Sequence, residues 1–578
     1  MTQSVLATTF LEEPRWFGPA DRPLFGWLTT PTQGVVHGGV LLAPPIGREA
    51  RAGRRALRYL ATTLATHGVA SLRFDYRGTG DSSGSFDEPA RALAWTKSVV
   101  EAERFLRDLG LQSVSAVGLR LGATLVGVAA REHDLAFASM VLWDPCESGR
   151  TYLRELSALE SLRREDFAPN PDGSIETSEF VFTLDTAEDL RSLSLLDSPG
   201  SRLAERVMVM SRSERPVSKK LRTSLQDEKV EWATTPQQAS LLDVEPLSAQ
   251  MPVQTIERIV DWLVETHATP TTLTVLAPVA AAVVARSPDG TEITERCVKI
   301  GTDQLFGIVC EPTSEVQGPL IVLINVANED HTGPARLWVE LSRRWASYGL
   351  RSVRFDLSGL GDSPWHPGQP DRTLYNEQWL SDVPEVVRSL CPSDPSNVVF
   401  IGLCSGAYLA AESALTLDAH AVCAINPPVG LDFLHLTARL ERSRRAVVRS
   451  LASPLKELSI HLRWVAAATW QVCRLLLPSR YRRDVLSSLV DNGTRLFVLA
   501  SEDDLSPYPR VPLLRSIDRR RIVSPRNYEV EMVPGLDHSM HTAVGRDRAV
   551  ALLDAYVLEH FAPDVGEGDV TQRTKEAS

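Results

Sequence analysis

A cysteine lies at the centre of a Gly-x-x-x-Gly turn in the second half of the chain. An apolar run over 398–401, expected to be a buried strand, enters Gly402-Leu-Cys404-Ser-Gly406, and a helix over 407–415 follows. The glycines permit a turn sharp enough to lift the central side chain clear of a sheet. The helix N-terminus would favour a thiolate there. The pattern predicts Cys404 as a nucleophile; Ser405 is a weaker alternative because it lies off the centre of the turn.

An acid and a base follow in the chain order that such a nucleophile requires. Asp503 and Asp504 come just after one expected strand, and His538 comes just after the next. Nucleophile, acid and histidine in this order predict a catalytic triad. We assign Asp504 as the acid, with Asp503 as the second choice, and His538 as the base. His541 is close enough in sequence to compete with His538.

The same turn predicts where a developing oxyanion would be bound. One donor is the backbone N–H of Ser405, and a second is expected in the loop after the first strand of this half, at Ala327 or Asn328. These groups predict acyl transfer, in which the thiolate attacks the carbonyl of a carboxylic ester or thioester and forms a covalent acyl-enzyme. Release of the acyl group to water makes a hydrolase, and release to another acceptor makes an acyltransferase.

The chain contains an internal repeat. The sequence 73–82, RFDYRGTGDS, recurs at 354–363 as RFDLSGLGDS, 281 residues later. Leu-Phe-Gly at 24–26 recurs at 305–307, and Gly-Leu-Arg-Leu-Gly-Ala at 118–123 recurs as Gly-Leu-Cys-Ser-Gly-Ala at 402–407. Three landmarks in one order, at nearly one spacing, predict a duplicated domain of just under 300 residues. Both copies alternate expected strands and helices, which predicts mostly parallel sheets with helices on both faces.

The first copy lacks the chemistry of the second. Arg120 occupies the centre of its turn, and a guanidinium cannot act as an acyl nucleophile. Glu214 holds the acid position, and the only later histidine before the boundary between the copies is His267. We expect Arg120 to form a structural salt bridge with Glu214. The alternative is that Arg120 binds an anion such as a phosphate or carboxylate at a degenerate site.

These motifs resemble a known branch of the α/β-hydrolases. The first copy, with Pro44-Pro45, the 72–84 motif and Arg120 at the elbow, resembles the exosortase A system-associated hydrolases of the second type. The second copy, with His331-Thr-Gly-Pro334 and the elbow around Cys404, resembles the first type. The resemblance implies a bacterial protein linked to surface-polysaccharide export, with a Cys–Asp–His triad in the second domain. Dienelactone hydrolases and polyester synthases, which also place a cysteine at this elbow, show that the fold supports hydrolysis and acyl transfer.

The expected fold is therefore α/β, with two tandem α/β-hydrolase domains, each a mostly parallel doubly wound sheet. We expect a degenerate domain over 1–270, a linker over 271–285, a catalytic domain over 286–563 and a disordered tail over 564–578. A helical cap is expected over about 427–491 in the second domain. Residues 431–490 contain eleven Lys/Arg and four acidic residues. This asymmetry is explained either by a solvated helix face or by a docking surface for an acyl carrier protein or an anionic membrane surface.

Bulk composition excludes several classes of protein. A net charge of −12 disfavours nucleic acid as a partner. The seven cysteines are scattered without a CxxC spacing, which argues against a disulfide framework or a zinc site and favours a reducing, cytoplasmic compartment. We expect no signal peptide, and we expect no transmembrane segment because no apolar run reaches the about 20 residues that a membrane span needs. We expect no cofactor and no metal.

Three functions remain open on these residues. The first is a hydrolase acting on a small-molecule ester or thioester through Cys404, His538 and Asp504. The second is an acyltransferase that uses the same cysteine. The third is a non-catalytic scaffold or binding protein in a surface-polysaccharide or secondary-metabolite pathway, since one copy has already lost its triad.

Overall fold

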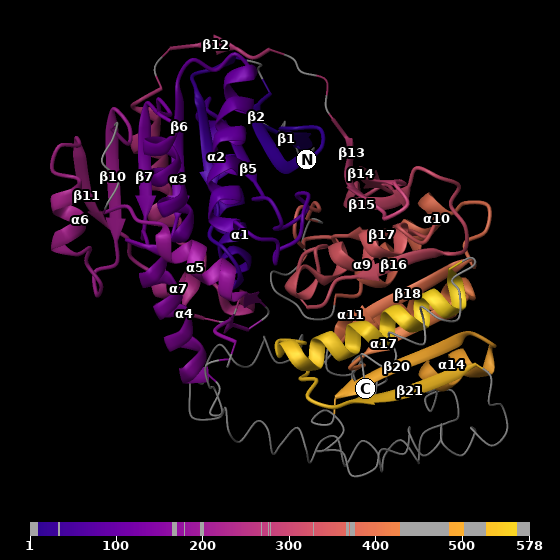
Figure 1. Ribbon diagram of the computed structural model, residues 1–578. Helices are drawn as coiled ribbons and strands as arrows, with labels where there is room; N and C mark the ends of the chain where they lie inside the picture. The colour runs from indigo at the N-terminus through magenta and orange to yellow at the C-terminus, as the bar shows by residue number, and fades with distance from the viewer. Residues whose placement is uncertain are drawn as a thin grey trace, which may run out of the picture. The chain divides into compact units, whose positions relative to one another are not determined.

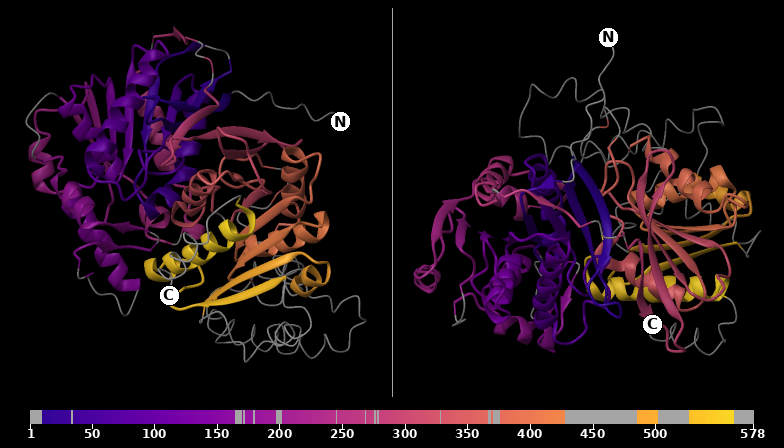
Figure 2. Two further views of the ribbon diagram at one scale, coloured as in Figure 1. Left: turned by 45° about the vertical axis from the view of Figure 1, so that its right-hand side comes forward. Right: turned by 90° about the horizontal axis from the view of Figure 1, so that it is seen from above.

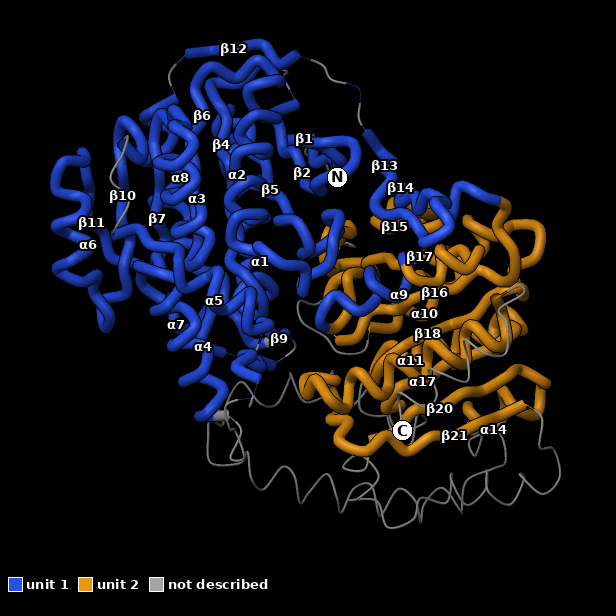
Figure 3. Tube along the Cα trace, viewed as in Figure 1, with its two compact units in different colours: residues 1–297, 312–314, 335–343 blue, residues 298–311, 315–334, 344–578 orange. Residues whose placement is uncertain are grey.

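The computed structural model describes residues 10–562, except 33–34, 164–169, 171, 179, 197–201, 245, 268, 275–276, 278, 328, 366–368, 370–375, 428–484 and 502–526. The chain divides into two compact units, shown in Figure 3. The first unit comprises residues 1–297, 312–314 and 335–343, and the second comprises residues 298–311, 315–334 and 344–578. Most of the expected cap, both candidate acids and the polar tail lie outside the described residues.

An eight-stranded sheet forms the centre of the first unit (Figure 1). Its spatial order is β1(Phe10–Phe17), β2(Leu24–Pro31), β5(Ala70–Phe74), β4(Gly39–Ala43), β6(Val114–Leu119), β7(Ser139–Trp143), β10(Arg206–Ser211) and β11(Val230–Thr234). β2 pairs antiparallel with β1 and β5, and all pairs from β5 to β11 are parallel. The carboxyl ends of the parallel strands therefore meet at one edge, where ligand sites form in such sheets.

A nine-stranded sheet repeats this plan. Its order is β13(Ala281–Arg286), β14(Glu292–Ile300), β15(Leu305–Pro312), β17(Arg351–Phe355), β16(Leu320–Ile324), β18(Val398–Leu403), β19(Ala421–Ile425), β20(Arg495–Ser501) and β21(Tyr528–Val533). From β14 onward the order of strands along the chain and across the sheet matches that of the first sheet. The repeat in the sequence thus corresponds to a repeat of topology. Part of the expected linker is also in strands, since β12(Thr271–Thr272) pairs with β3(Val35–Val36) and β13 begins at residue 281.

Helices cover both faces of the first sheet because its strand residues alternate between two apolar clusters. Val40 and Leu42 pack with α1(Arg48–Thr66) and α8(Val253–Val264), whereas Leu41 packs with α2(Arg91–Asp108) and α3(Leu121–Glu132) on the other face. This alternation follows from the two-residue period of a strand. The remaining elements of this unit are α4(Gly149–Arg163), β8(Ile175–Glu176), β9(Val181–Phe182), α5(Leu184–Ser192), α6(Lys219–Ser224), α7(Gln238–Leu242) and η1(Pro246–Ser248).

The second sheet is covered in the same way. Figure 2, seen from above, shows α17(Ala543–Phe561) on one face and α10(Trp379–Leu390) and α11(Ser405–Leu417) on the other. α9(Leu337–Ala346) is joined to α17, because the indole Nε1 of Trp345 donates to Asp554 at 3.0 Å. The other helices are η2(Pro334–Arg336) and α14(Val485–Asp491). Among the described residues, no helix is long and apolar enough to cross a bilayer.

The repeated Arg-Phe-Asp…Gly-Asp-Ser motif is a structural lock in both copies. In the second copy the Ser363 hydroxyl donates to the Asp356 carbonyl at 2.6 Å and accepts from the Phe306 N–H at 2.9 Å. In the first copy Ser82 makes the same two bonds, to Asp75 and from Phe25, at 2.6 and 2.9 Å. The motif therefore fixes the loop after one central strand against the antiparallel strand beside it, whether or not the copy carries a nucleophile.

Candidate active site

Cys404 lies at a strained turn between β18 and α11. Its φ and ψ are 50° and −113°, a backbone conformation that costs of the order of 1–3 kcal/mol and persists only when its surroundings impose it. Close packing of the backbone imposes it here. A Cβ on Gly402 would lie 2.3 Å from the carbonyl carbon of Gly406, and a Cβ on Gly406 would lie 2.6 Å from the carbonyl oxygen of Asn325. The Cys404 N–H donates to Ile425 on β19 at 2.9 Å, so the thiol stands at the carboxyl edge of the sheet.

The structure brings His538 to Cys404. The imidazole Nε2 lies 3.1 Å from the Cys404 Sγ, within reach for transfer of the thiol proton. His538 is exposed and Cys404 is partly buried. His541 takes a different place, because its Nδ1 lies 3.9 Å from a carboxylate oxygen of Asp537. Of the two candidate histidines, the structure places His538 at the thiol.

Two residues that sequence reasoning missed hold the segment carrying His538. Asn426, which is buried just after β19, donates through its amide to the carbonyls of Asp537 at 3.1 Å and His538 at 3.0 Å. Its amide oxygen accepts from the Ser501 N–H at 2.8 Å, at the end of β20. One side chain therefore joins three successive strand ends. A polar residue directly after a buried apolar strand was the signal in the sequence.

Asp537 is the second residue that sequence reasoning missed. Its carboxylate accepts from the Thr542 N–H at 2.8 Å and from the His541 N–H at 3.1 Å. Burial alone would raise the pKa of Asp537, but these N–H groups and the Thr542 hydroxyl hold the pKa below its usual range. The carboxylate stays charged and closes the turn that runs from His538 into α17.

The candidate acids lie just beyond a described strand end. β20 ends at Ser501, and Asp503 and Asp504 lie outside the described residues. The assignment of Asp504 as the acid, with Asp503 as the second choice, stays a prediction.

Two of the expected oxyanion residues, Ser405 and Ala327, are in contact. Ser405 is the first residue of α11, where backbone N–H groups have no partner within the helix. The Ala327 N–H, in the loop after β16, donates to the Ser405 hydroxyl oxygen at 2.8 Å. Ser405 is buried and its hydroxyl is engaged with this loop, whereas the sulfur of Cys404 faces the histidine. Asn328 lies outside the described residues.

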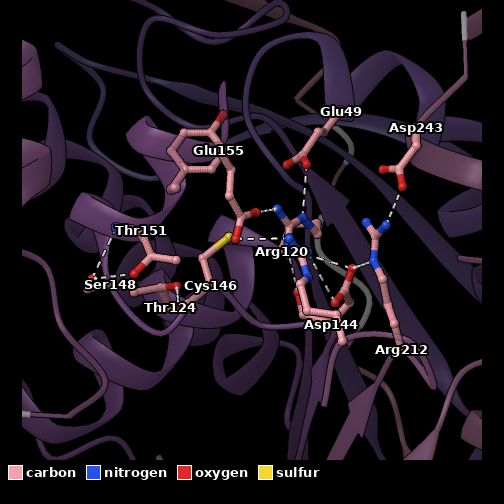
Figure 4. A network of polar contacts seen from close by, with 12 residues as sticks. Glu49, Arg120, Thr124, Asp144, Cys146, Ser148, Thr151, Glu155, Arg212 and Asp243 are labelled. Atoms are coloured by element: carbon pink, nitrogen blue, oxygen red, sulfur yellow. Dashed lines mark hydrogen bonds and ion pairs between the residues drawn. The ribbon is translucent and has the colours of Figure 1, made fainter. Parts of the chain in front are cut away.

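The first copy has the same turn with a different occupant. Arg120 has φ and ψ of 56° and −120°, and its N–H donates to Trp143 at 3.0 Å, as that of Cys404 does to Ile425. The Arg120 guanidinium binds Glu49 at 2.9 Å and Glu155 at 2.5 Å, as Figure 4 shows. The expected partner Glu214 is exposed, so the predicted Arg120–Glu214 salt bridge is wrong. Glu49 and Glu155 come from α1 and α4, and Glu214, which follows β10, is not among the partners of the guanidinium.

A larger network surrounds this arginine. Asp144 lies 3.6 Å from Arg120 and accepts from Arg212 at 2.7 Å, and Arg212 continues to Asp243 (Figure 4). Burial would lower the pKa of Arg120, but the negative charge around it raises the pKa well above its usual range. Arg120 already has Glu49, Asp144 and Glu155 as ion-pair partners, and Arg212 and Arg215 share two of these carboxylates, so the guanidinium does not need an added anion. The geometry favours a structural network over the anion-binding alternative.

His267 cannot complete a site in the first copy. Its Nδ1 lies 3.0 Å from the Ser113 hydroxyl, just before β6 begins, whereas Arg120 follows the other end of that strand. A strand of this length separates its ends by roughly 20 Å at about 3.3 Å per residue. Across the described ranges, no group of three His, Cys, Asp or Glu side chains is placed to hold a metal ion.

Part of the chain is similar to known proteins. Residues 330–554 match the family model of the alpha/beta hydrolase family. Est1E from Butyrivibrio proteoclasticus is 15% identical, with 44% of this chain and 99% of that one covered and a TM-score of 0.33. Proline iminopeptidase from Mycobacterium smegmatis is 13% identical, with 44% and 99% covered and a TM-score of 0.31. No curated protein matches the chain. On its strand order, its two elbows and the match over residues 330–554, the chain has an α/β-hydrolase fold.

Proposed function

We propose that the second unit hydrolyses a carboxylic ester or thioester of a small molecule through an acyl-enzyme on Cys404. The observation that carries this proposal is the 3.1 Å contact between the Cys404 Sγ and the His538 Nε2 at a strained elbow. The thiol stands at the N-terminus of α11, where a helix stabilises negative charge by typically about 0.3–1 kcal/mol. The match to the alpha/beta hydrolase family over 330–554 supports a hydrolytic enzyme.

The residues have the following roles in this proposal. His538 takes the thiol proton, and the thiolate attacks the substrate carbonyl carbon to give a tetrahedral oxyanion held by the N–H groups of Ser405 and Ala327. The oxyanion collapses, the alkoxide or thiolate leaving group takes the proton from His538, and the acyl group remains on Cys404. His538 then deprotonates a water, which attacks the acyl-enzyme and releases the carboxylic acid and the thiol. Asp504 orients the imidazolium through Nδ1.

A second candidate function is acyl transfer. The acyl-enzyme is itself a thioester, and an amine, hydroxyl or thiol acceptor can replace the water in the last step. The basic cap segment would then dock an acyl carrier protein or an anionic membrane surface. Charge reversal at Arg442, Arg444 and Arg445 tests this, because unchanged partner binding and unchanged turnover would remove the docking role.

The pathway and location are also proposals. The likeness of both copies to exosortase A system-associated hydrolases supports a role in a surface-polysaccharide or secondary-metabolite pathway of a bacterium. The scattered cysteines support a cytoplasmic location. A third candidate function is a non-catalytic scaffold. The first unit supports it, because Arg120 there replaces the nucleophile, and the second unit would then have lost its activity as well.

The test is intact-mass spectrometry after incubation with acyl-thioester and activated-ester donors. Wild type is expected to gain one acyl group, Cys404→Ala none, and His538→Ala the same group far more slowly. Cys391→Ala is the matched control, because Cys391 is a second partly exposed thiol in this unit and should not affect labelling. Turnover of the adduct by water or by an added acceptor separates hydrolase from transferase. Failure of every donor to acylate Cys404 would favour the scaffold.

A further inference from the structure

The loop that carries Ala327 is tied down by the amide of Asn325. The Asn325 Nδ2 donates to the Glu329 carbonyl at 2.8 Å, and its Oδ1 accepts from the Leu357 N–H at 3.2 Å, just beyond β17. The Glu329 N–H donates to the Val326 carbonyl at 2.9 Å, which closes the loop as a turn. The loop is thereby joined to the end of the neighbouring strand.

A buried histidine–aspartate pair holds the other end of this loop. The Asp356 carboxylate accepts from the backbone N–H of His331 at 2.7 Å and lies 2.9 Å from its Nδ1. Both side chains are 0% exposed. A charged carboxylate only accepts, so the Nδ1 carries the proton in this contact. The Phe306 ring packs edge to face against the imidazole, with the two ring centroids 5.0 Å apart. This contact restricts the orientation of the His331 ring.

The first copy provides an internal comparison. Its Asp75 corresponds to Asp356 and likewise accepts from a backbone N–H of its Gly-Asp-Ser lock, at 3.0 Å compared with 2.9 Å. Where the second copy has Asn325, the first has Pro44. A Cβ on Gly122 would lie 2.4 Å from the Pro44 carbonyl oxygen, and a Cβ on Gly406 would lie 2.6 Å from the Asn325 carbonyl oxygen, so the two residues occupy the same place beside the elbow. Proline has no side-chain amide.

The first copy also has no counterpart of the His331 side chain. At the offset of 281 residues, His331 corresponds to Ala50, which has no ring donor. The lock is shared by both copies, whereas the asparagine and the histidine occur only in the copy with a cysteine at the elbow. The shared part is therefore structural, and the added part is confined to the copy that carries the cysteine.

We propose that His331, through Asp356, is a positioning residue that holds the Ala327 N–H ready for the oxyanion. The inference rests on the proposed acyl chemistry at Cys404. Ala327 has a φ of 50°, which a residue with a Cβ keeps only when neighbouring groups impose it. An oxyanion donor contributes most when it is fixed before the reaction begins. The Ala327 N–H donates to the Ser405 hydroxyl at 2.8 Å, so this donor lies beside the residue that follows Cys404.

Two variants separate the donor from the ring. His331→Phe keeps an aromatic ring against Phe306 and removes the Nδ1 proton, whereas His331→Asn restores an N–H donor near the same place. Two reactions of one thiol are compared in each variant. Alkylation by iodoacetamide needs no oxyanion hole, and acylation by p-nitrophenyl acetate does. Hydrogen exchange of the peptide covering 325–331 reports on the loop without any substrate.

His331→Phe is expected to slow acylation at least 30-fold and to change alkylation less than threefold. The same variant should raise hydrogen exchange in the 325–331 peptide. His331→Asn should recover at least a third of the lost acylation rate. Ser363→Ala is the matched control, since it breaks the shared lock and should lower both rates equally or neither. Equal slowing of both reactions in His331→Phe, or unchanged exchange, would overturn the positioning role. If wild-type Cys404 alkylates but never acylates, the proposed function fails, and the exchange result alone still decides whether His331 holds the loop.

Discussion

The side-chain amide of Asn426 donates to the backbone carbonyl of His538 at 3.0 Å, so the residue that follows β19 fixes the proposed base that follows β21. The ring of His538 is exposed, and a solvated imidazole has many orientations available. The anchor limits these orientations by holding the backbone.

Loss of the Asn426 amide should lower activity more than stability. Asn426→Ala removes three hydrogen bonds to backbone groups, and we expect acylation of Cys404 to fall about 10–100-fold as His538 loses its position. The free energy of unfolding should fall by about 1–3 kcal/mol. Acylation rates and urea titrations measure the two effects. Asn527→Ala, which loses one amide–carbonyl bond to Val490, is the control and should leave acylation within twofold.

The elbow glycines should be intolerant of a methyl group in both copies. Gly406→Ala would place a Cβ 2.6 Å from Asn325 O, and Gly122→Ala would place one 2.4 Å from Ala43 O. Such overpacking costs about 1–3 kcal/mol. Thermal melts should show destabilisation by both variants, and acylation per folded molecule should fall only with Gly406→Ala. Equal loss of acylation with Gly122→Ala would mean that the first copy contributes directly to the reaction.

Arg120 should be a stabilising residue of the first unit. Arg120→Met leaves Glu49 without its ion-pair partner, while Asp144 and Glu155 keep Arg212 and Arg215, and removal of one member of a buried charge network costs about 3–5 kcal/mol. Denaturant unfolding measures this cost. Glu214→Gln should change stability by less than about 0.5 kcal/mol, because Glu214 is exposed. A large effect of Glu214→Gln together with a small effect of Arg120→Met would restore the pairing expected from the sequence.

His267 should make stability depend on pH. Burial, with a smaller effect of the charge on His37, lowers the pKa of His267 from 6.5 to about 4. The folded pKa lies below the unfolded one, so between these values the unfolded chain binds a proton that the folded chain does not. Stability is therefore unaffected above about pH 6.5 and falls as pH drops toward 4, by up to about 3 kcal/mol.

His267→Gln should remove this part of the pH dependence. Urea midpoints for wild type and variant at pH 7.5, 6, 5 and 4.5 measure it, and the advantage of wild type should shrink steadily below pH 6.5. The variant also loses the contact with the Ser113 hydroxyl at 3.0 Å, which sets a constant offset at high pH. A wild-type curve parallel to that of the variant across the range would show that His267 titrates normally.

Asp504 should matter more than Asp503. Asp504→Asn is expected to reduce acylation by roughly 10²–10⁴-fold, since the orienting charge on the histidine is lost, and Asp503→Asn by less than about threefold. Both residues follow β20 with the same side-chain type, so each is the matched control of the other. The reverse order of effects would assign Asp503 as the acid.

The sequence alone determined the features that depend on local backbone geometry and on repetition. A strand, Gly-x-x-x-Gly and a helix can meet in few ways, so the position of Cys404 at an elbow followed from spacing. The duplication followed from three landmarks at nearly one offset, and both sheets have the strand order that this implies. His538 was accessible to the same reasoning because a residue just past a parallel strand lies at the edge where the elbow ends.

Only the tertiary structure decided which side chains meet across distant segments. Arg120 forms ion pairs with Glu49 and Glu155 on two helices, whereas the sequence predicted a pair with Glu214 at a strand end. His331 and Asp356 meet because β16 and β17 are neighbours in the sheet, and Asn426 reaches His538 because β19, β20 and β21 are adjacent. The physical reason is that spacing along the chain constrains the backbone of one segment. The partner of a buried polar group depends on which elements pack around it, and a burial cost is met by whichever group the fold brings within hydrogen-bonding distance.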